Sequence, residues 1–460
     1  MPASRPTHRI PVTPPCAQAG ASTLTAPINL LASRPPWRQT FSSLKVRNFR
    51  LFATAHMVAV IALWMQRIAQ DWLVLQLSGS VTAVGITVAM QFAPTLLLMP
   101  LGGMIADRYS KRMILMISQG AAGILALAMA VLALTGSIQV WHIYGIAFML
   151  GLVTVVDQPA RQVFVNELVG PAQLRNAISV NSSLFQIGAM IGPAISGVLI
   201  SAVGGGWAFA VNAAACVFTV VMLSCLRPAD LLKSAPAPRS RGQLREGLDY
   251  ALAKPTIFWP ALMAGFIAVF AMSLPVLMAA YANNVFDSGA GGYGLLNTLV
   301  AVGALAGAMA STRRPVLRLR TVVGSAGTYG VLLVVAAAAP GMWIFCAVMV
   351  FAGFASLTFL TSSNQLVQIS TNVRIRGRVM SLYIMVLMGG QAIGGPLIGA
   401  LAEHLGPQWA TVIAGIVPAA AAAVIAVVLA RRGQLTLKVS RKSRRHPLLI
   451  VRRQEAAASA

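Results

Sequence analysis

Acidic residues are scarce in this chain of 460 residues, which has 10 Asp and Glu against 35 Lys and Arg. Charged residues of both signs make up only 10% of the chain, and hydrophobic residues make up 57%. A soluble globular protein has about 25% charged residues, so this chain has too little charge to cover a surface that faces water. The composition therefore excludes soluble enzymes, coiled coils and disordered proteins, and it leaves a polytopic membrane protein.

Patterns that bind metals or nucleotides are also missing. The four cysteines share no short spacing, so we expect buried free thiols rather than a disulfide framework or a metal site. The five histidines are scattered, and no Walker-type phosphate loop occurs. We therefore expect no enzyme activity, no metal and no cofactor, and ATP is not the direct energy source.

Long apolar runs fill most of the chain. A membrane-spanning helix needs about 20 mostly apolar residues, and barrel strands are shorter than these runs. The sequence therefore predicts an all-α protein with twelve transmembrane helices. The expected spans are 49–75, 82–106, 113–135, 139–162, 177–202, 206–226, 257–282, 291–312, 321–339, 342–366, 379–402 and 408–430.

Lys and Arg residues gather in the tails and in every second loop between the predicted spans. If the N-terminus is cytoplasmic, the inner loops, helix ends and tails hold 34 of the 35 Lys and Arg, and Arg67 is the remaining one. This asymmetry follows the positive-inside rule. We expect a plasma (inner) membrane protein with both termini in the cytoplasm, whose net charge of +25 contacts membrane lipids and not nucleic acid.

The chain divides into two similar halves. We expect a disordered cytoplasmic tail over 1–48, six helices over 49–226, a cytoplasmic linker over 227–256, six helices over 257–430 and a basic cytoplasmic tail over 431–460. The Gly-Pro pair at 192–193 in the fifth span matches the pair at 395–396 in the eleventh. Such repeats place a substrate site between two halves that rock against each other.

A motif follows the second span, where residues 103–112 read GMIADRYSKR. It resembles the loop signature of the major facilitator superfamily, with serine at 110 in place of the usual glycine. The matching positions, a candidate gating motif, are Gly103, Asp107, Arg108, Lys111 and Arg112. Gly103 permits a close helix approach, and Asp107 can face a helix N-terminus or a cation. An ordinary positive-inside loop explains the basic residues but not the aspartate.

A second motif lies in the fifth span, where Gly188, Gly192, Pro193 and Gly197 are similar to the helix motif of superfamily antiporters. A structural role is the alternative, since small residues four apart let helices touch. Residues 64–80 (WMQRIAQDWLVLQLSGS) and 157–161 (DQPAR) look like the enterobactin-exporter-like branch, the transmembrane secretion effectors. This resemblance implies two pseudo-symmetric six-helix halves and efflux driven by the proton gradient.

Ionisable residues inside a span are costly and usually functional. On a helical projection of the first span, His56, Gln66, Arg67, Gln70 and Asp71 share one face of about 140°, which must look into the bundle or a wet cavity. Arg67 and Asp71 are one turn apart and can pair, which is the structural alternative. The functional interpretation makes Asp71 a proton or cation acceptor that Arg67 tunes.

The fourth span repeats this spacing with Asp157 and Arg161. Asp157 is a second proton-coupling candidate, although a pair with Arg161 is an equal possibility. Arg161 can also reach Asp107 and close the cytoplasmic side. The remaining polar candidates for the cavity wall are amides: Asn181, Gln186, Asn297, Asn364 and Gln391.

These features predict a secondary active exporter of a small, siderophore-like or drug-like molecule, which works by proton antiport and alternating access as a monomer. An importer or a lysolipid flippase of the same fold is the alternative within this class. A transport-inactive membrane sensor or scaffold is the alternative outside it.

Overall fold

Helices make up nearly all of the computed structural model, which describes residues 28–29, 42–232, 243–312, 316–317, 319–372, 375–432, 435–439 and 448–452. The α-helices are α1 (Arg47–Ser78), α2 (Val81–Arg108), α3 (Lys111–Leu134), α4 (Val140–Val203), α5 (Gly206–Ser224), α6 (Gln243–Ala253), α7 (Pro255–Phe266), α8 (Leu274–Ala280), α9 (Gly289–Thr312), α10 (Leu319–Ala337), α11 (Met342–Ser370), α12 (Arg376–Leu405) and α13 (Pro407–Arg432). Short 3-10 helices cover Ser42–Lys45 and Pro228–Asp230, and π-helical turns cover Ile267–Ala271 and Tyr281–Val285. The strands are β1 (Ile28–Asn29), β2 (Val316–Leu317), β3 (Leu435–Val439) and β4 (Leu448–Arg452), which pair β1 with β2 and β3 with β4.

The described helices form twelve segments that are long and apolar enough to cross a membrane, which confirms the predicted number. Helix α4 contributes two of them, Val140–Gly170 and Asn176–Val203. They join at Gly170, whose φ of 68° is open to glycine but costly for other residues. The following Pro171 also disfavours a helical conformation at the residue before it. The interrupted helices α7 and α8, with their π-helical turns, form the single span Pro255–Val285.

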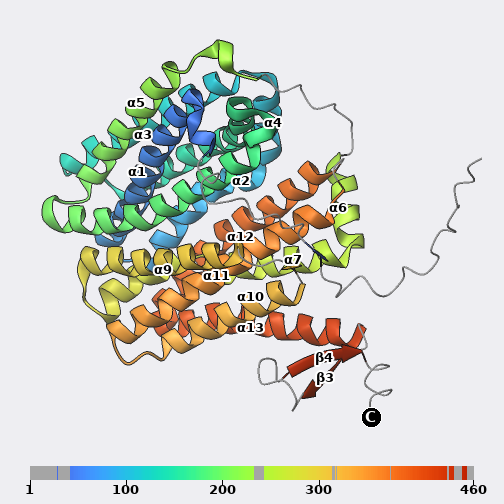
Figure 1. The fold of residues 1–460 in the computed structure, drawn as a ribbon. Helices are drawn as coiled ribbons and strands as arrows, with labels where there is room; N and C mark the ends of the chain where they lie inside the picture. The colour runs from blue at the N-terminus through green and yellow to red at the C-terminus, as the bar shows by residue number, and fades with distance from the viewer. Residues whose placement is uncertain are drawn as a thin grey trace, which may run out of the picture.

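The twelve spans divide into two bundles of six (Figure 1). Helices α1–α5 form the first half, and α7–α13 form the second half, with α4 and α9 side by side where the halves meet. Within the first half, α1 packs against α4 and α5. This arrangement confirms the predicted all-α fold with two six-helix halves. The exact domain boundaries stay predictions.

The two tails fall mostly outside the described residues, as does the middle of the linker at 233–242. The predicted disorder of 1–48 therefore stays a prediction. In the basic tail 431–460, the described part is the end of α13 and the hairpin of β3 and β4. Helix α6 lies in the predicted linker and packs against α7 and α12.

The two ends of the bundle differ in charge. We call one the basic end, because Arg50, Arg108, Lys111, Arg227 and Arg376 lie there at helix ends. We call the other the opposite end. It holds the turns at Gly79, Gly204 and Gly406, whose φ values of 65°, 91° and 87° favour glycine.

Candidate functional site

The polar face of α1 is turned into the protein. His56, Gln66, Gln70 and Asp71 are buried, and Arg67 is half-buried. Buried polar groups are costly unless they find partners, so the partners of this face show what it does. The prediction that the face looks into the bundle is confirmed.

Asp71 connects the two halves. Its carboxylate accepts a hydrogen bond of 3.2 Å from the Tyr293 hydroxyl, which belongs to α9 in the other half. The neighbouring Trp72 ring stacks on the Tyr293 ring with centroids 5.9 Å apart. Asn297, one turn along α9, donates to the Tyr293 carbonyl oxygen at 2.9 Å. Asp71 lies seven residues before the end of α1, about 10 Å at 1.5 Å per residue, and therefore nearer the opposite end than the middle of the span.

Arg67 does not form an ion pair with Asp71, so the predicted structural pair is wrong in this conformation. The ion pairs among the described residues join Lys111 to Glu167 and Arg161 to Asp157. The Arg67 guanidinium lies over the rings of Trp64 and Phe92, at 5.2 and 5.7 Å from their centroids. A basic residue one turn before an acidic residue has the less favourable helical order for pairing, and Tyr293 is close enough to donate to the carboxylate.

Asp157 and Arg161 do form a pair, inside the first half. The Arg161 nitrogens contact both Asp157 oxygens at 2.9 to 3.0 Å. Gln119 of α3 lies 3.4 Å from Asp157 Oδ1, and His56 Nδ1 lies 3.3 Å from Arg161. The His56 ring stacks on Phe52. This cluster holds α1, α3 and α4 together, and Arg161 uses its guanidinium there, so the proposed contact to Asp107 finds no support.

The predicted amides have different surroundings. Gln66 accepts a hydrogen bond of 2.5 Å from Asn212 of α5, a partner that the sequence did not reveal. Gln391 is buried and donates to Leu387 O at 3.4 Å, and Asn364 accepts from Gln368 at 2.5 Å. Gln186 is half-buried. The Gln70 amide and the Asn181 Oδ1 are buried with no hydrogen-bond partner among the described residues.

Glu403, near the end of α12, makes a second polar contact between the halves. Its carboxylate accepts from the Ser80 hydroxyl at 2.5 Å and from the Thr82 backbone N–H at 2.9 Å. Ser80 is the N-cap of α2, where free backbone N–H groups favour an anion. Sequence reasoning missed both Glu403 and Tyr293, because each acts through a residue of the other half.

Glycines bring the halves into contact at the same end. A Cβ at Gly85 of α2 would overlap the carbonyl oxygen of Gly395 in α12, and a Cβ at Gly399 would lie 2.8 Å from Val81 O. The halves therefore touch directly along the parts of α2 and α12 that approach the opposite end. Side chains larger than hydrogen at these glycines would separate the helices.

The antiporter-like glycines pack as the pattern predicts. A Cβ at Gly188 would lie 2.5 Å from the Val60 side chain, and one at Gly192 would lie 2.6 Å from the Trp64 Cβ. Gly197, beyond Pro193, faces the other half, and its Cβ would lie 3.0 Å from Gly294 Cα. Ser196 replaces a motif glycine and donates to the Met65 carbonyl oxygen at 2.9 Å. The motif thus fits α4 against α1 and α9.

In the loop motif after α2, the prediction for Gly103 is wrong. The close helix approach is at Gly102, whose Cβ would overlap Val155 O, while the space around Gly103 is open. Lys111 pairs with Glu167 at 3.6 Å, and Arg112 donates to carbonyl oxygens at the end of α5, where a cation is favourable. Arg108 is exposed. The Asp107 side chain lies outside the described atoms, so its gating role stays a prediction.

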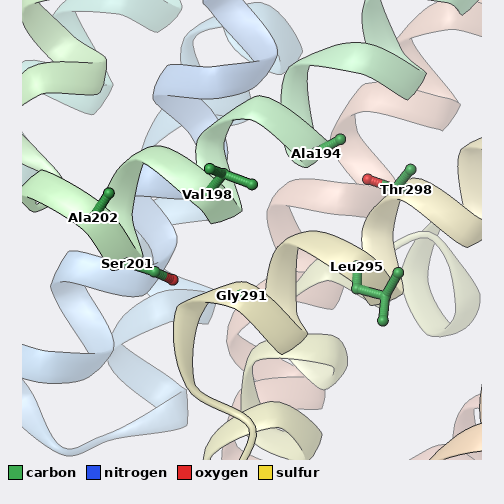
Figure 2. A pocket seen from close by; sticks show the side chains of 7 residues that line it. All are labelled: Ala194, Val198, Ser201, Ala202, Gly291, Leu295 and Thr298. Carbon is green, nitrogen blue, oxygen red and sulfur yellow. The ribbon is translucent and has the colours of Figure 1, made fainter.

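A cavity of about 530 Å³ lies between α4 and α9 near the opposite end (Figure 2). Its lining residues are Ala194, Val198, Ser201, Ala202, Gly291, Leu295 and Thr298. This lining is mostly apolar, with two hydroxyl groups and no charged side chain. The charged groups described above therefore lie outside this cavity lining.

Comparison with known proteins supports the architecture. The chain is similar to the enterobactin exporter EntS of Escherichia coli O139:H28, with 27% identity over 389 residues, covering 82% of this chain and 90% of the relative. The EntS protein of Citrobacter koseri is 27% identical over 397 residues, covering 83% and 92%.

Two solved structures share the fold. One is a bacterial homolog to the human lysosomal transporter Spinster, inward-facing and unoccupied, with a TM-score of 0.60, 16% identity and coverage of 87% of this chain and 97% of that chain. The other is a bacterial homologue of the iron transporter ferroportin, in an inward-facing state, with a TM-score of 0.63, 16% identity and coverage of 84% and 98%.

The family model of transmembrane secretion effectors matches residues 38–455, which is most of the chain. Its members, like the structural neighbours, are transporters and not enzymes, in agreement with the sequence. The chain therefore belongs to the transmembrane secretion effectors of the major facilitator superfamily, and it is a multi-pass secondary transporter.

Proposed function

We propose that the chain exports a small amphipathic molecule by proton antiport, as a monomer in the inner membrane, with its basic end in the cytoplasm. The similarity to enterobactin exporters supports a siderophore-like cargo. The absence of Lys and Arg from the six loops of the opposite end supports the orientation. No cofactor is needed, because the proton gradient supplies the energy.

In the proposed orientation, the contacts at the opposite end close the outer side of the protein. The structure then corresponds to the inward-facing state of the transporter. Glu403, the paired glycines and the Asp71–Tyr293 bond all join the halves on the outer side. Polar side chains are exposed inside the spans toward the basic end. They are Thr54, Gln162, Ser182, Ser183 and Gln368. Water that reaches such groups from the cytoplasm gives the cargo a route to the middle of the protein.

Asp71 carries the coupling in this proposal, and the hydrogen bond from Tyr293 is the observation that supports it. When the halves separate on the outer side, the bond breaks and the carboxylate meets external water, where it can take a proton. When the halves close again, Asp71 is buried beside positively charged Arg67 and can lose the proton toward the cytoplasm. Asp157 is the weaker candidate, because Arg161 already pairs with it.

Transport into vesicles tests this role. Asp71→Asn keeps the shape of the side chain and removes its titration, so we expect cargo accumulation driven by an imposed pH gradient to be lost. Exchange of labelled for unlabelled cargo, which needs no gradient, should partly remain. Asp157→Asn is the matched control and should still accumulate cargo when it is correctly folded.

Tyr293→Phe removes the donor but keeps the ring that stacks on Trp72. We expect it to weaken coupling less than Asp71→Asn does. If Asp71→Asn vesicles concentrate cargo at the native rate, Asp71 is not the proton carrier. Cargo that moves in the same direction as the protons would favour an importer. The absence of any cargo transport would favour a sensor.

A further inference from the structure

Arg67 is a cation within a membrane span that has no hydrogen bond or ion pair with any described residue. A guanidinium carries five N–H donors in a planar fork. Its central carbon lies 5.2 and 5.7 Å from the centroids of the Trp64 and Phe92 rings. Phe185 of α4 stands edge-on to Trp64 at 6.1 Å and is 40% exposed. The N–H donors of Arg67 therefore have no acceptor among the described residues and can serve a ligand.

The position of α1 shows from where a ligand can arrive. Helix α1 packs against α4 and α5 of its own half and also touches α8 and α9 of the other half. Part of α1 therefore lies where the two halves meet. Arg67 is half-buried, and it lies one turn closer to the basic end than Asp71. A molecule entering from the basic end meets Arg67 before it meets the closed contact of Asp71 with Tyr293.

We propose that Arg67 anchors an oxyanion of the exported molecule, and that the Trp64, Phe92 and Phe185 rings hold an aromatic part beside it. The cargo class is an aromatic organic anion that carries a carboxylate, phenolate or sulfonate group. Arginine binds such groups with two parallel charge-assisted hydrogen bonds and also stacks on aromatic faces. This inference rests on the proposed export function and identifies the chemistry of its cargo.

Asp71 connects this binding to the movement of the halves. Its buried carboxylate has two favourable neighbours, the Tyr293 hydroxyl and the positive charge of Arg67. An anion on Arg67 neutralises that positive charge, so a buried, ionised Asp71 loses part of its stabilisation. Hydration of Asp71 then becomes more favourable, and it requires the halves to part at the opposite end. Cargo binding thereby promotes the opening through which the cargo leaves.

Binding of two nearly isosteric probes tests the site. Purified full-length protein in detergent is dialysed to equilibrium against 1-naphthoate, which is anionic, or 1-naphthamide, which is neutral. We expect the wild type to bind the naphthoate about tenfold more tightly, as charge-assisted hydrogen bonds imply. Arg67→Gln should bind both probes equally, and Arg67→Lys should lie between. Phe92→Leu should weaken both probes alike, since it removes a ring and no charge.

Arg50→Gln is the matched control, because this exposed arginine lies on the same helix at the basic end. It should keep the preference for naphthoate, and each variant must keep the melting temperature of the wild type within a few degrees. The proposal is overturned if Arg67→Gln keeps the preference. It is also overturned if the wild type does not distinguish the probes, or binds neither at millimolar concentration.

The dialysis uses no gradient, so it separates this proposal from the proton antiport. A preference that depends on Arg67, without pH-driven transport, would support the anion site and refute the coupling. If transport depends on Asp71 but the preference for naphthoate does not depend on Arg67, the export function stands and the anion site is refuted.

Discussion

Two pairs of Asp and Arg residues have the same four-residue spacing in this protein, but only one of them forms an ion pair. In α4, Asp157 precedes Arg161, and the two side chains form a bidentate ion pair within the first half. In α1, Arg67 precedes Asp71, and the two side chains turn to different partners. Asp157 thus holds helices of one half together, while Asp71 connects the halves through Tyr293.

This difference separates two kinds of contact. Contacts within a half persist through an alternating-access cycle, so their polar groups can be fully paired. Contacts between the halves at the opposite end must break in each cycle, and the polar ones described above are hydrogen bonds without a partner cation: one to Asp71 and two to Glu403, beside glycines that touch. Changes within a half should therefore alter stability, and changes between the halves should alter the balance of conformations.

Arg161→Gln should have the largest effect on stability. It leaves the Asp157 carboxylate without its cation inside the bundle, which costs about 2–4 kcal/mol for a mostly buried pair. We expect the melting temperature in detergent to fall by about 5 °C or more. Asp71→Asn should change it far less, because the contact it alters is a single hydrogen bond. An equal fall in melting temperature in both variants would contradict the distinction between contacts within a half and contacts between the halves.

The double variant Arg161→Gln with Asp157→Asn sharpens this result. Removing both charges leaves no buried ion unpaired, so part of the lost stability should return. A double variant that melts at or below the single variant would show that the ion pair is not the cause.

Gly85→Ala should shift the conformations most strongly. The added Cβ would overlap the Gly395 carbonyl oxygen, so the halves cannot close fully at the opposite end. We expect the distance between spin labels at Gln76 and His404, two exposed positions at that end, to increase in a cysteine-free background. Gly145→Ala is the control, because the space around Gly145 is open. An unchanged distance in Gly85→Ala would contradict the close contact.

Glu403→Gln should have a smaller effect of the same sign. The amide oxygen can still accept from Thr82 N–H, but without the charge that strengthens the bond. Glu403 is exposed to solvent, which weakens its interactions. We expect the population with the longer distance between the labels to increase roughly twofold relative to the population with the shorter distance. A shift toward the shorter distance would show that Glu403 does not hold the halves together.

Removal of residues 436–460 should have the smallest effect. These residues follow α13 and take no part in the twelve spans. We expect transport by the truncated protein in proteoliposomes to stay close to that of the full chain. Complete loss of transport by a correctly folded truncation would contradict a passive tail.

The glycine motifs show how far a local pattern can be trusted. The antiporter-like motif predicted close packing at Gly188 and Gly192, and both contact α1. The loop motif suggested the same for Gly103, but Gly102 makes the contact. Neighbouring residues on a helix point about 100° apart, so a small rotation of α2 decides which glycine meets α4. That rotation depends on packing and not on the local sequence.

The sequence by itself determined the twelve spans, the two halves and the burial of the polar face of α1. Each follows from composition or from the period of a single helix, because a bilayer forces apolar segments into helices and buries polar stripes. Only the tertiary structure decided that Asp71 bonds to Tyr293, that Arg67 keeps its donors free among aromatic rings, and that Glu403 meets α2. The hydrogen bond to Asp71 joins residues 222 positions apart, and the two hydrogen bonds to Glu403 join residues 321 and 323 positions apart. The relative placement of two rigid halves creates them, and no local preference encodes that placement.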